Sequence, residues 1–89
     1  MSQAPSVTED DVDSLIVGEE YHVFPGTTVT VCCLTLQNGY SVIGSSACVS
    51  FSRFDYQVGR TAARADARDK IWALEGYLLR QRIHDKKVA

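Results

Sequence analysis

One amphipathic pattern constrains the fold of this 89-residue chain more than any other feature. Between Phe54 and Arg82, the members of an apolar stripe recur every three or four positions, which is the spacing of one face of an α-helix. The stripe consists of Gly59, Ala63, Ala67, Ile71, Leu74 and Leu78. Its first half is small and predicts close approach to a neighbour, whereas its second half is bulky and predicts ordinary packing. We expect one helix, with two helices joined near Trp72 as the alternative.

A series of arginines runs beside the small half of the stripe, again at intervals of four. They are Arg60, Arg64 and Arg68. Like charges one helical turn apart repel each other by a few tenths of a kcal/mol per pair. A phosphate clamp would explain the series, because guanidinium groups bind phosphate oxygens in a bidentate way. The alternative is pairing with Asp66 and Asp69 across subunits, together with a cation–π contact between Arg68 and Trp72.

Charge is distributed unevenly along the chain. Residues 1–52 contain six acids and no Lys or Arg, whereas residues 53–89 contain nine basic residues and five acids. This asymmetry favours an anionic partner for the second half or head-to-tail contacts between subunits, and two solvated faces of opposite sign are the simpler alternative. The overall acidity, with a pI near 5.5, argues against DNA or RNA as the partner.

The first half predicts a short helix followed by three antiparallel strands. Thr8 is a candidate N-cap for a helix over 9–17, with Asp11 completing an approximate capping box and Gly18 ending the helix. Strands are expected over 20–24, 27–36 and 40–49, where β-branched residues are frequent. Ser52 or Asp55 would cap the long helix that follows.

The dipeptide Asn38-Gly39 predicts a two-residue type I′ hairpin. That loop would place Gln37 opposite Tyr40. The resulting register pairs Leu34 with Ile43, Leu36 with Ser41, Cys32 with Ser45 and Thr35 with Val42. Both faces of the sheet would be partly apolar, which suits helices on one side and a second copy of the chain on the other.

We therefore predict a single α+β domain over residues 1–89. It comprises a flexible tail over 1–7, a helix over 8–18, a sheet over 20–50 and helical structure over 54–84. A chain this short buries a limited share of its surface, which favours a homo-oligomer, either a dimer or a larger assembly of dimers. The acidic start has no apolar core typical of a signal peptide, no stretch could span a membrane, and the cysteine number is odd, so we expect reduced thiols in a cytosol.

No catalytic constellation is evident. His22 and His84 lie in different elements, and Cys32 and Cys33 are adjacent in a strand, so their side chains point to opposite faces and cannot hold one metal ion. We therefore predict a protein that is not an enzyme and uses no metal or cofactor. Binding signals are stronger: Phe51, Phe54 and Tyr56 form either a platform for stacking a base or a packed junction.

The chain also carries motifs that resemble a known family. The segments EYHVFPGTTVTVC, NGY, SACV and FDYQVGRTAARADARDKIWALEGYLL resemble small tailed-phage proteins known by gene numbers forty-nine and sixty-six of two podoviruses. The resemblance covers residues 8–84 and implies no established activity. Members often have Pro after the Trp, where this chain has Ala73, so the resemblance leaves a break of the helix open.

A weaker resemblance, in architecture, is to the phage sponges that counter Thoeris immunity. Those proteins assemble from dimers and bind glyco-cyclic ADP-ribose or, in some cases, the cyclic oligonucleotides of CBASS immunity, without cleaving them. The resemblance implies base stacking by Phe54 or Tyr56, phosphate contacts from the basic residues, and a ribose or adenine contact from Asp66. The basic residues are Arg60, Arg64, Arg82 and Lys86, beside the clamp residue Arg68. The host cytoplasm is the expected location, and an early phage protein that modulates a host protein is the alternative.

Overall fold

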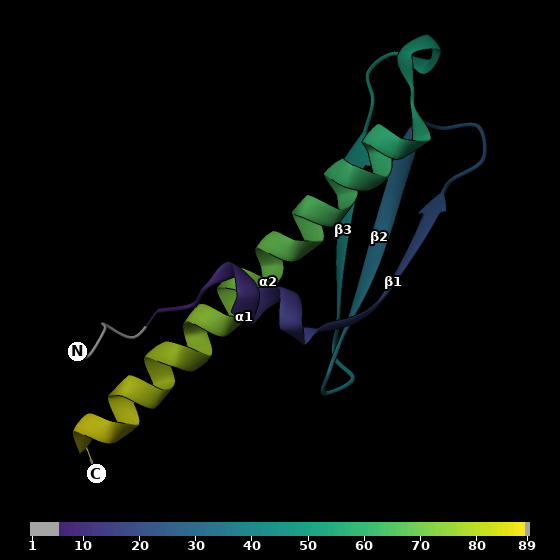
Figure 1. Ribbon diagram of the computed structural model, residues 1–89. Coiled ribbons are helices and arrows are strands. Elements are labelled where there is room, and N and C mark those ends of the chain that lie inside the picture. The colour runs from purple at the N-terminus through teal and green to yellow at the C-terminus, as the bar shows by residue number, and fades with distance from the viewer. Residues whose placement is uncertain (1–5, 89) are drawn as a thin grey trace.

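The computed structural model describes residues 6–88, and the side chains of residues 6–86. The elements follow the order α1 (Glu9–Leu15), β1 (Ile16–Val23), β2 (Val29–Leu36), β3 (Ser41–Ala47), the 3₁₀ turn η1 (Phe51–Arg53) and α2 (Tyr56–Val88). The strands form one antiparallel sheet in the order β1-β2-β3, and α2 lies across one face of it (Figure 1). This arrangement confirms the predicted α+β class.

Helix α1 begins as the sequence predicts. The Asp11 N–H donates to Thr8 Oγ1 at 3.1 Å, and the Thr8 N–H donates to Asp11 Oδ2 at 2.9 Å, which completes the capping box. The helix ends at Leu15, because the chain turns directly into β1 at Ile16. The predicted end at Gly18 is therefore wrong; Gly18 lies within β1, next to an irregularity in its pairing with β2. Of the predicted tail, residues 1–5 lie outside the described residues, and Val7 packs against the core.

The β2–β3 hairpin differs from the predicted one by one residue. Leu36 N–H donates to Tyr40 O at 2.8 Å, Gly39 N–H donates to Leu36 O at 2.9 Å, and Gly39 has φ of 89°. Asn38 does not adopt positive φ, and its Oδ1 accepts the Tyr40 N–H at 3.0 Å. The loop is thus a three-residue one, a type I turn followed by a left-handed glycine, instead of the two-residue type I′ turn.

This change of loop moves every residue of β3 to the other face of the sheet. Leu34 pairs with Val42, Thr35 with Ser41 and Cys32 with Gly44. The predicted pairs of Leu34 with Ile43 and of Cys32 with Ser45 are wrong. Val42 and Gly44 consequently face α2, and Ile43 faces away from it, with 48% of its surface exposed.

Helix α2 is one continuous helix of 33 residues. It continues past Trp72 and Ala73 without a break, as the residues alone predict. Its start is fixed by Asp55, whose Oδ1 accepts the Gln57 N–H at 2.8 Å. The other predicted cap, Ser52, instead shares a hydrogen bond with Ser50.

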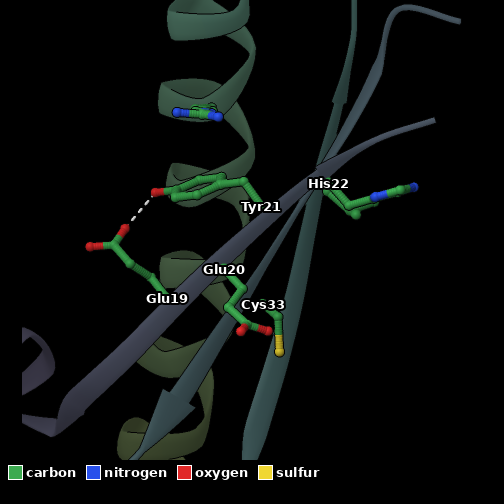
Figure 2. A pocket seen from close by; sticks show the side chains of 7 residues that line it. Glu19, Glu20, Tyr21, His22 and Cys33 are labelled. Carbon is green, nitrogen blue, oxygen red and sulfur yellow. Dashed lines mark hydrogen bonds between the residues drawn. The ribbon is translucent and has the colours of Figure 1, made fainter. Parts of the chain in front are cut away.

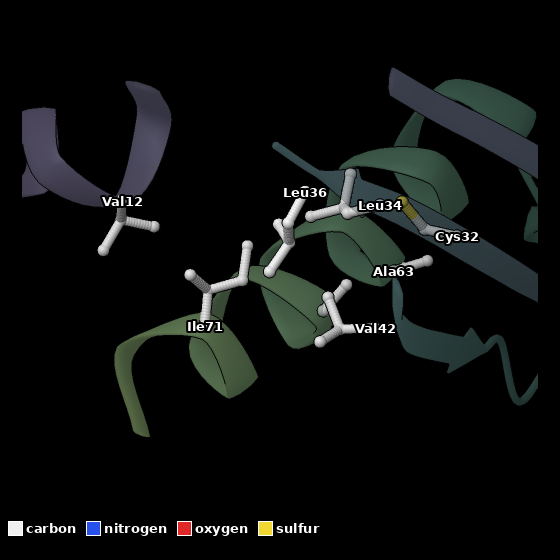
Figure 3. Close-up of a cluster of buried hydrophobic side chains, with 8 residues drawn as sticks. Val12, Cys32, Leu34, Leu36, Val42, Ala63 and Ile71 are labelled. Carbon is white, nitrogen blue, oxygen red and sulfur yellow. The ribbon is translucent and has the colours of Figure 1, made fainter. Parts of the chain in front are cut away.

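The core lies where the small half of the α2 stripe meets the sheet. A Cβ added to Gly44 would lie 2.2 Å from both Ala63 O and Ala67 N, so the two backbones meet without intervening side chains. Figure 3 shows the buried apolar residues of this core, from α1 at one end to the sheet at the other. The buried set is Val12, Cys32, Leu34, Leu36, Val42, Ala63, Ala67 and Ile71. The predicted close approach is therefore confirmed.

The bulky half of the stripe behaves differently. Ile71 is fully buried, but Leu74 is 37% exposed and Leu78 is 45% exposed. At this point α2 projects beyond the end of the sheet (Figure 1). The molecule is therefore elongated, with extents of 57 × 25 × 19 Å along its principal axes. The prediction that this half packs in the ordinary way is wrong beyond Ile71, because the strands are too short to reach it.

No helix or strand of residues 6–88 covers the second face of the sheet, which we call the open face (Figure 1). Residues of β2 alternate between buried positions, which face α2, and half-buried ones such as Val31 and Cys33, which face away. A second copy on this face remains a prediction. Across residues 6–88, no helix is long and apolar enough to cross a membrane.

Candidate arginine groove

A groove between β1 and the first half of α2 contains the three arginines of the helical series, Arg60, Arg64 and Arg68, which we call the arginine ridge. The groove itself we call the arginine groove; its volume is about 510 Å³. It is lined by Glu19, Tyr21, Gln57, Arg60, Thr61, Arg64, Ala65 and Arg68. Sites for small molecules occupy roughly 300–1,000 Å³ in proteins. The groove is therefore large enough for a nucleotide, and its walls come from a strand and a helix far apart in the sequence.

Two of the three arginines already have acidic partners within the chain. Arg64 Nε lies 3.2 Å from Glu19 Oε2, and Arg68 Nε lies 2.8 Å from Asp13 Oδ1. Arg68 Nη1 also lies 3.7 Å from Glu9 Oε1. The acidic first half of the chain thus faces the basic helix of the same chain. This explains much of the charge asymmetry without a partner.

Asp66, one of the two acids predicted to pair with the arginines across subunits, has a partner within the chain, and pairing across subunits remains a prediction. Asp66 Oδ2 accepts the backbone N–H of Ser45 at 2.9 Å, on the side of α2 that faces β3. The predicted cation–π contact is confirmed, since the Arg68 guanidinium lies 5.8 Å from the centroid of the Trp72 ring. Arg68 is the most enclosed of the ion-paired arginines, with 19% of its side chain exposed.

These contacts set the ionisation of the acids in and beside the groove. The hydrogen bond from Arg68 holds the pKa of Asp13 below its ordinary value. The pKa of Glu19 is also lowered, first by a hydrogen bond from the Tyr21 hydroxyl and then by the charge of Arg64. Burial, followed by the hydrogen bond to Glu19, raises the pKa of Tyr21. At neutral pH the Glu19 carboxylate therefore binds both a phenol and a guanidinium group.

Arg60 differs from the other two arginines. Its guanidinium lies 5.4 Å from the centroid of the Tyr21 ring, and no acidic side chain among the described residues pairs with it. Figure 2 shows the neighbourhood: Tyr21 points to the helix side and is hydrogen-bonded to Glu19, whereas His22 points away. A shallow depression of about 570 Å³ at this edge is also lined by Arg60. Arg60 is thus the ridge cation with donors available for a ligand.

The remaining predicted site residues lie outside the groove. Phe54 and Tyr56 contact each other edge to face, with centroids 5.1 Å apart, and Phe54 lines a separate cavity of about 190 Å³. Asp66 faces β3, as described above. Arg82 borders a hollow beside α1, and Lys86 is exposed near the end of α2. One chain therefore brings together only Arg60, Arg64 and Arg68 of the eight predicted residues.

Comparison with known families decides the origin of the chain. Residues 7–83 match the model of the family described as Phage protein (N4 Gp49/phage Sf6 gene 66). The chain belongs to this phage protein family. The family resemblance seen in the sequence is thereby confirmed. No curated protein and no solved structure matches the chain. The likeness to anti-defence sponges therefore remains a prediction.

Several groove residues of this family member were missed by reasoning from the sequence. Gln57 and Thr61 lie three residues before Arg60 and Arg64, so helical spacing could have placed them on the ridge. Glu19 and Tyr21 carry no such local signal. They reach the groove because the pairing of β1 with β2 places both side chains on the face toward α2. The contact between Glu19 and Arg64 joins residues that are 45 positions apart in the sequence.

The cysteines and histidines stand apart from the groove. Cys32 is buried and Cys33 is half-buried on the opposite face, as their adjacency predicts, and burial raises the pKa of the Cys32 thiol. His22 packs edge to face with Phe24, at a centroid distance of 4.9 Å. Within the described part of the chain, no three His, Cys, Asp or Glu side chains gather in a group that could hold a metal ion.

Proposed function

We propose that this phage protein binds and sequesters an anionic cyclic nucleotide signal in the host cytoplasm, without cleaving it. The signal would be glyco-cyclic ADP-ribose or a cyclic oligonucleotide. The observation that carries this proposal is Arg60, a cation that pairs with no acid among the described side chains and stands over the Tyr21 ring in a groove of nucleotide size. Phosphate oxygens are the groups that guanidinium binds best.

The groove offers complementary groups for such a ligand. Gln57 supplies an amide beside Arg60, whereas the Thr61 hydroxyl donates to Gln57 O at 2.9 Å within the helix. Arg64 is half-exposed, so it can turn from Glu19 toward a phosphate. Hydrogen bonds to charged groups contribute about 1.5–3 kcal/mol each. Three or four of them approach the roughly 8 kcal/mol that corresponds to micromolar affinity.

Calorimetry with a panel of cyclic nucleotides tests the proposal. We expect saturable heat with at least one member of the panel, and at least about a tenfold weaker affinity for Arg60→Ala. Arg80→Ala is the matched control, because Arg80 is an exposed arginine of the same helix outside the groove. Chromatography of the released ligand should recover it intact. No heat with any ligand, or equal affinity of Arg60→Ala and the native protein, would contradict the proposal.

A second candidate function is binding of a host protein, and the open face of the sheet favours it. Phe24 is 46% exposed there and packs against His22, with Val31 half-buried nearby. Affinity capture from host lysate should return one stoichiometric partner with the native protein and with Arg60→Ala, but not with Phe24→Asp. Capture that depends on Arg60 and not on Phe24 would exclude the open face as the binding surface.

A further inference from the structure

An exposed apolar patch lies where the β2–β3 hairpin meets the projecting half of α2. We call it the hairpin–helix patch; it consists of Tyr40, Leu74, Tyr77 and Leu78. Tyr77 is 70% exposed and Tyr40 is 58% exposed. Between the hairpin and the helix, Tyr40, Ile43, Lys70 and Leu74 line a groove of about 380 Å³. Tyrosines are enriched at protein interfaces, since they combine a large apolar area with a polar tip.

The helix sequence continues an interaction seam beyond the sheet. From Ala67 onward the seam positions alternate in steps of four and three, which is the heptad spacing of paired helices. The apolar ones are Ala67, Ile71, Leu74 and Leu78, and the next two positions at this spacing, Gln81 and Asp85, are polar. The sheet covers the first two. On the neighbouring side of α2, the half-buried Glu75 and Leu79 border a hollow beside α1. The side that carries Leu74, Tyr77 and Leu78 is exposed and is not covered by any other described part of the chain.

We propose that a second copy of this chain covers the hairpin–helix patch, with the two α2 helices antiparallel about a two-fold axis between Tyr77 and Leu78. Charge favours this partner and this direction. With the axis at this point, Lys70 and Asp85 lie at equal distances before and after it along the helix. Antiparallel pairing therefore brings Lys70 of each copy toward Asp85 of the other, whereas parallel pairing would place like charges side by side. Within the chain, Lys70 Nζ donates to Ile43 O and Asp85 Oδ1 accepts from Gln81 Nε2 at 2.9 Å, so pairing between copies would exchange or share these contacts.

Length also fits a second copy. At 1.5 Å per residue, the segment from Leu78 to Val88 is about 15 Å long. Laid antiparallel from the axis, it passes the positions of Leu74 and Lys70, which lie about 5–11 Å away along the helix. The end of one helix would thus fill the groove between the hairpin and the helix of its partner. The radius of gyration of 16.6 Å, against about 12 Å for a compact chain of this length, shows how much of α2 one copy leaves unsupported.

This inference is independent of the proposed ligand. The hairpin–helix patch and the arginine groove share no residue. A protein that dimerises without binding any nucleotide would contradict the proposed function alone. A monomer that binds a nucleotide would contradict the dimer alone.

Light scattering coupled to size-exclusion chromatography tests the dimer on the full-length protein. The native protein should show twice the chain mass of 9.8 kDa at high concentration and dissociate on dilution. Leu78→Glu should give the monomer mass. Its fold should survive, because Leu78 lies beyond the sheet and is already 45% exposed. Val58→Glu is the matched control: Val58 is 65% exposed near the other end of α2, and its substitution should leave the mass unchanged.

A charge exchange tests the identity and direction of the partner. Lys70→Asp and Asp85→Lys should each weaken the dimer by at least about tenfold in Kd, and the double variant should recover most of that loss. Circular dichroism would verify that each variant keeps its helix. A native protein that is monomeric at every concentration would overturn the proposal. So would a dimer that tolerates Leu78→Glu, because its interface would then lie elsewhere, for instance on the open face of the sheet.

Discussion

The two halves of α2 belong to one continuous helix yet are held in opposite ways. From Tyr56 to Ile71, the stripe residues Ala63, Ala67 and Ile71 are fully buried against the sheet. From Trp72 onward, no described side chain of the helix is fully buried. The half with the smaller side chains is therefore the more buried one. Burial here depends on how closely two backbones can approach, and side-chain size alone does not predict it.

The same contrast holds for charge. Arg64 and Arg68, in the first half, are paired with acids of α1 and β1, whereas Lys86, in the second half, is exposed. The first half is thus fixed by both packing and ion pairs. The second half depends on helix propensity and, we infer, on a second copy of the chain.

The largest effect is expected where the two backbones touch. Gly44→Ala would add a Cβ only 2.2 Å from Ala63 O and Ala67 N, and neither backbone atom can move without displacing α2. We expect a loss of about 4 kcal/mol in the free energy of unfolding, at the upper end for an overpacked core. Urea denaturation measures it. A loss below about 1 kcal/mol would show that α2 does not sit this close to β3.

The next effect separates the two halves directly. Ile71→Ala removes a fully buried side chain and should cost about 3 kcal/mol. Leu78→Ala, seven residues later on the same stripe, should cost less than about 1 kcal/mol in dilute solution, because Leu78 is 45% exposed. Urea denaturation at low and high protein concentration compares them. The cost of Leu78→Ala should grow with concentration if a second copy covers it, and equal costs in dilute solution would refute the contrast.

Features of the fold that depend on residues close together in the sequence were predicted, whereas features that depend on distant contacts were not. The Thr8–Asp11 capping box, the three strands and the continuity of α2 rest on neighbours in the sequence, and each was predicted. The hairpin register was missed, because Asn38-Gly39 fits two loops and the choice depends on whether Gly44, rather than Ser45, faces α2. That choice is made by contact with Ala63 and Ala67, far away in the chain.

The candidate site was predictable to a smaller extent. Helical spacing places Arg60, Arg64 and Arg68 on one ridge, and the structure brings all three into one groove. Their partners Glu19 and Asp13 could not be predicted, since no local pattern states which strand residue will lie beside α2. The sponge resemblance grouped Phe54 with the arginines, but Phe54 lines a cavity beside Ser46 and Ala47 of β3, whereas the groove lies beside β1.

A smaller and opposite effect is expected under the first half of α2. Thr30 is fully buried in β2, and its Oγ1 has no hydrogen-bond partner among the described residues. An unpaired buried hydroxyl costs free energy that an apolar group of the same shape does not. Thr30→Val should therefore stabilise the protein by about 1 kcal/mol in urea denaturation. Destabilisation would indicate that the hydroxyl finds a partner, such as a buried water molecule.

Gly76→Ala makes the same chemical change as Gly44→Ala, but in the projecting half of α2. A Cβ at Gly76 would meet no atom within 4 Å, in contrast to one at Gly44. Alanine is favoured over glycine inside a helix by about 1 kcal/mol, so the variant should be stabilised by about 0.5–1 kcal/mol. Thermal denaturation followed by circular dichroism measures this gain. A loss of stability would mean that Gly76 is covered by another chain.

The smallest effect is expected from acid, acting on the ion pairs of the first half. The pKa values of Asp13 and Glu19 are lowered in the folded protein from ordinary values of 3.8 and 4.5. The unfolded chain therefore binds more protons than the folded one, so stability rises with pH through this window. The contribution is complete above the ordinary values and is lost as pH falls through the lowered ones. Urea midpoints measured from neutral pH to about pH 3 should show this loss, and the double variant Asp13→Asn, Glu19→Gln should show less of it.

High salt should shrink the difference between these two pH profiles, because partly exposed ion pairs are screened. Identical profiles at low salt would mean that Arg64 and Arg68 are not held by their acids in solution. That outcome would free all three arginines of the groove for a ligand. The same logic gives the ligand experiment a direction: Glu19→Gln releases Arg64 from its partner, so it should strengthen the binding of an anionic nucleotide where Arg60→Ala weakens it.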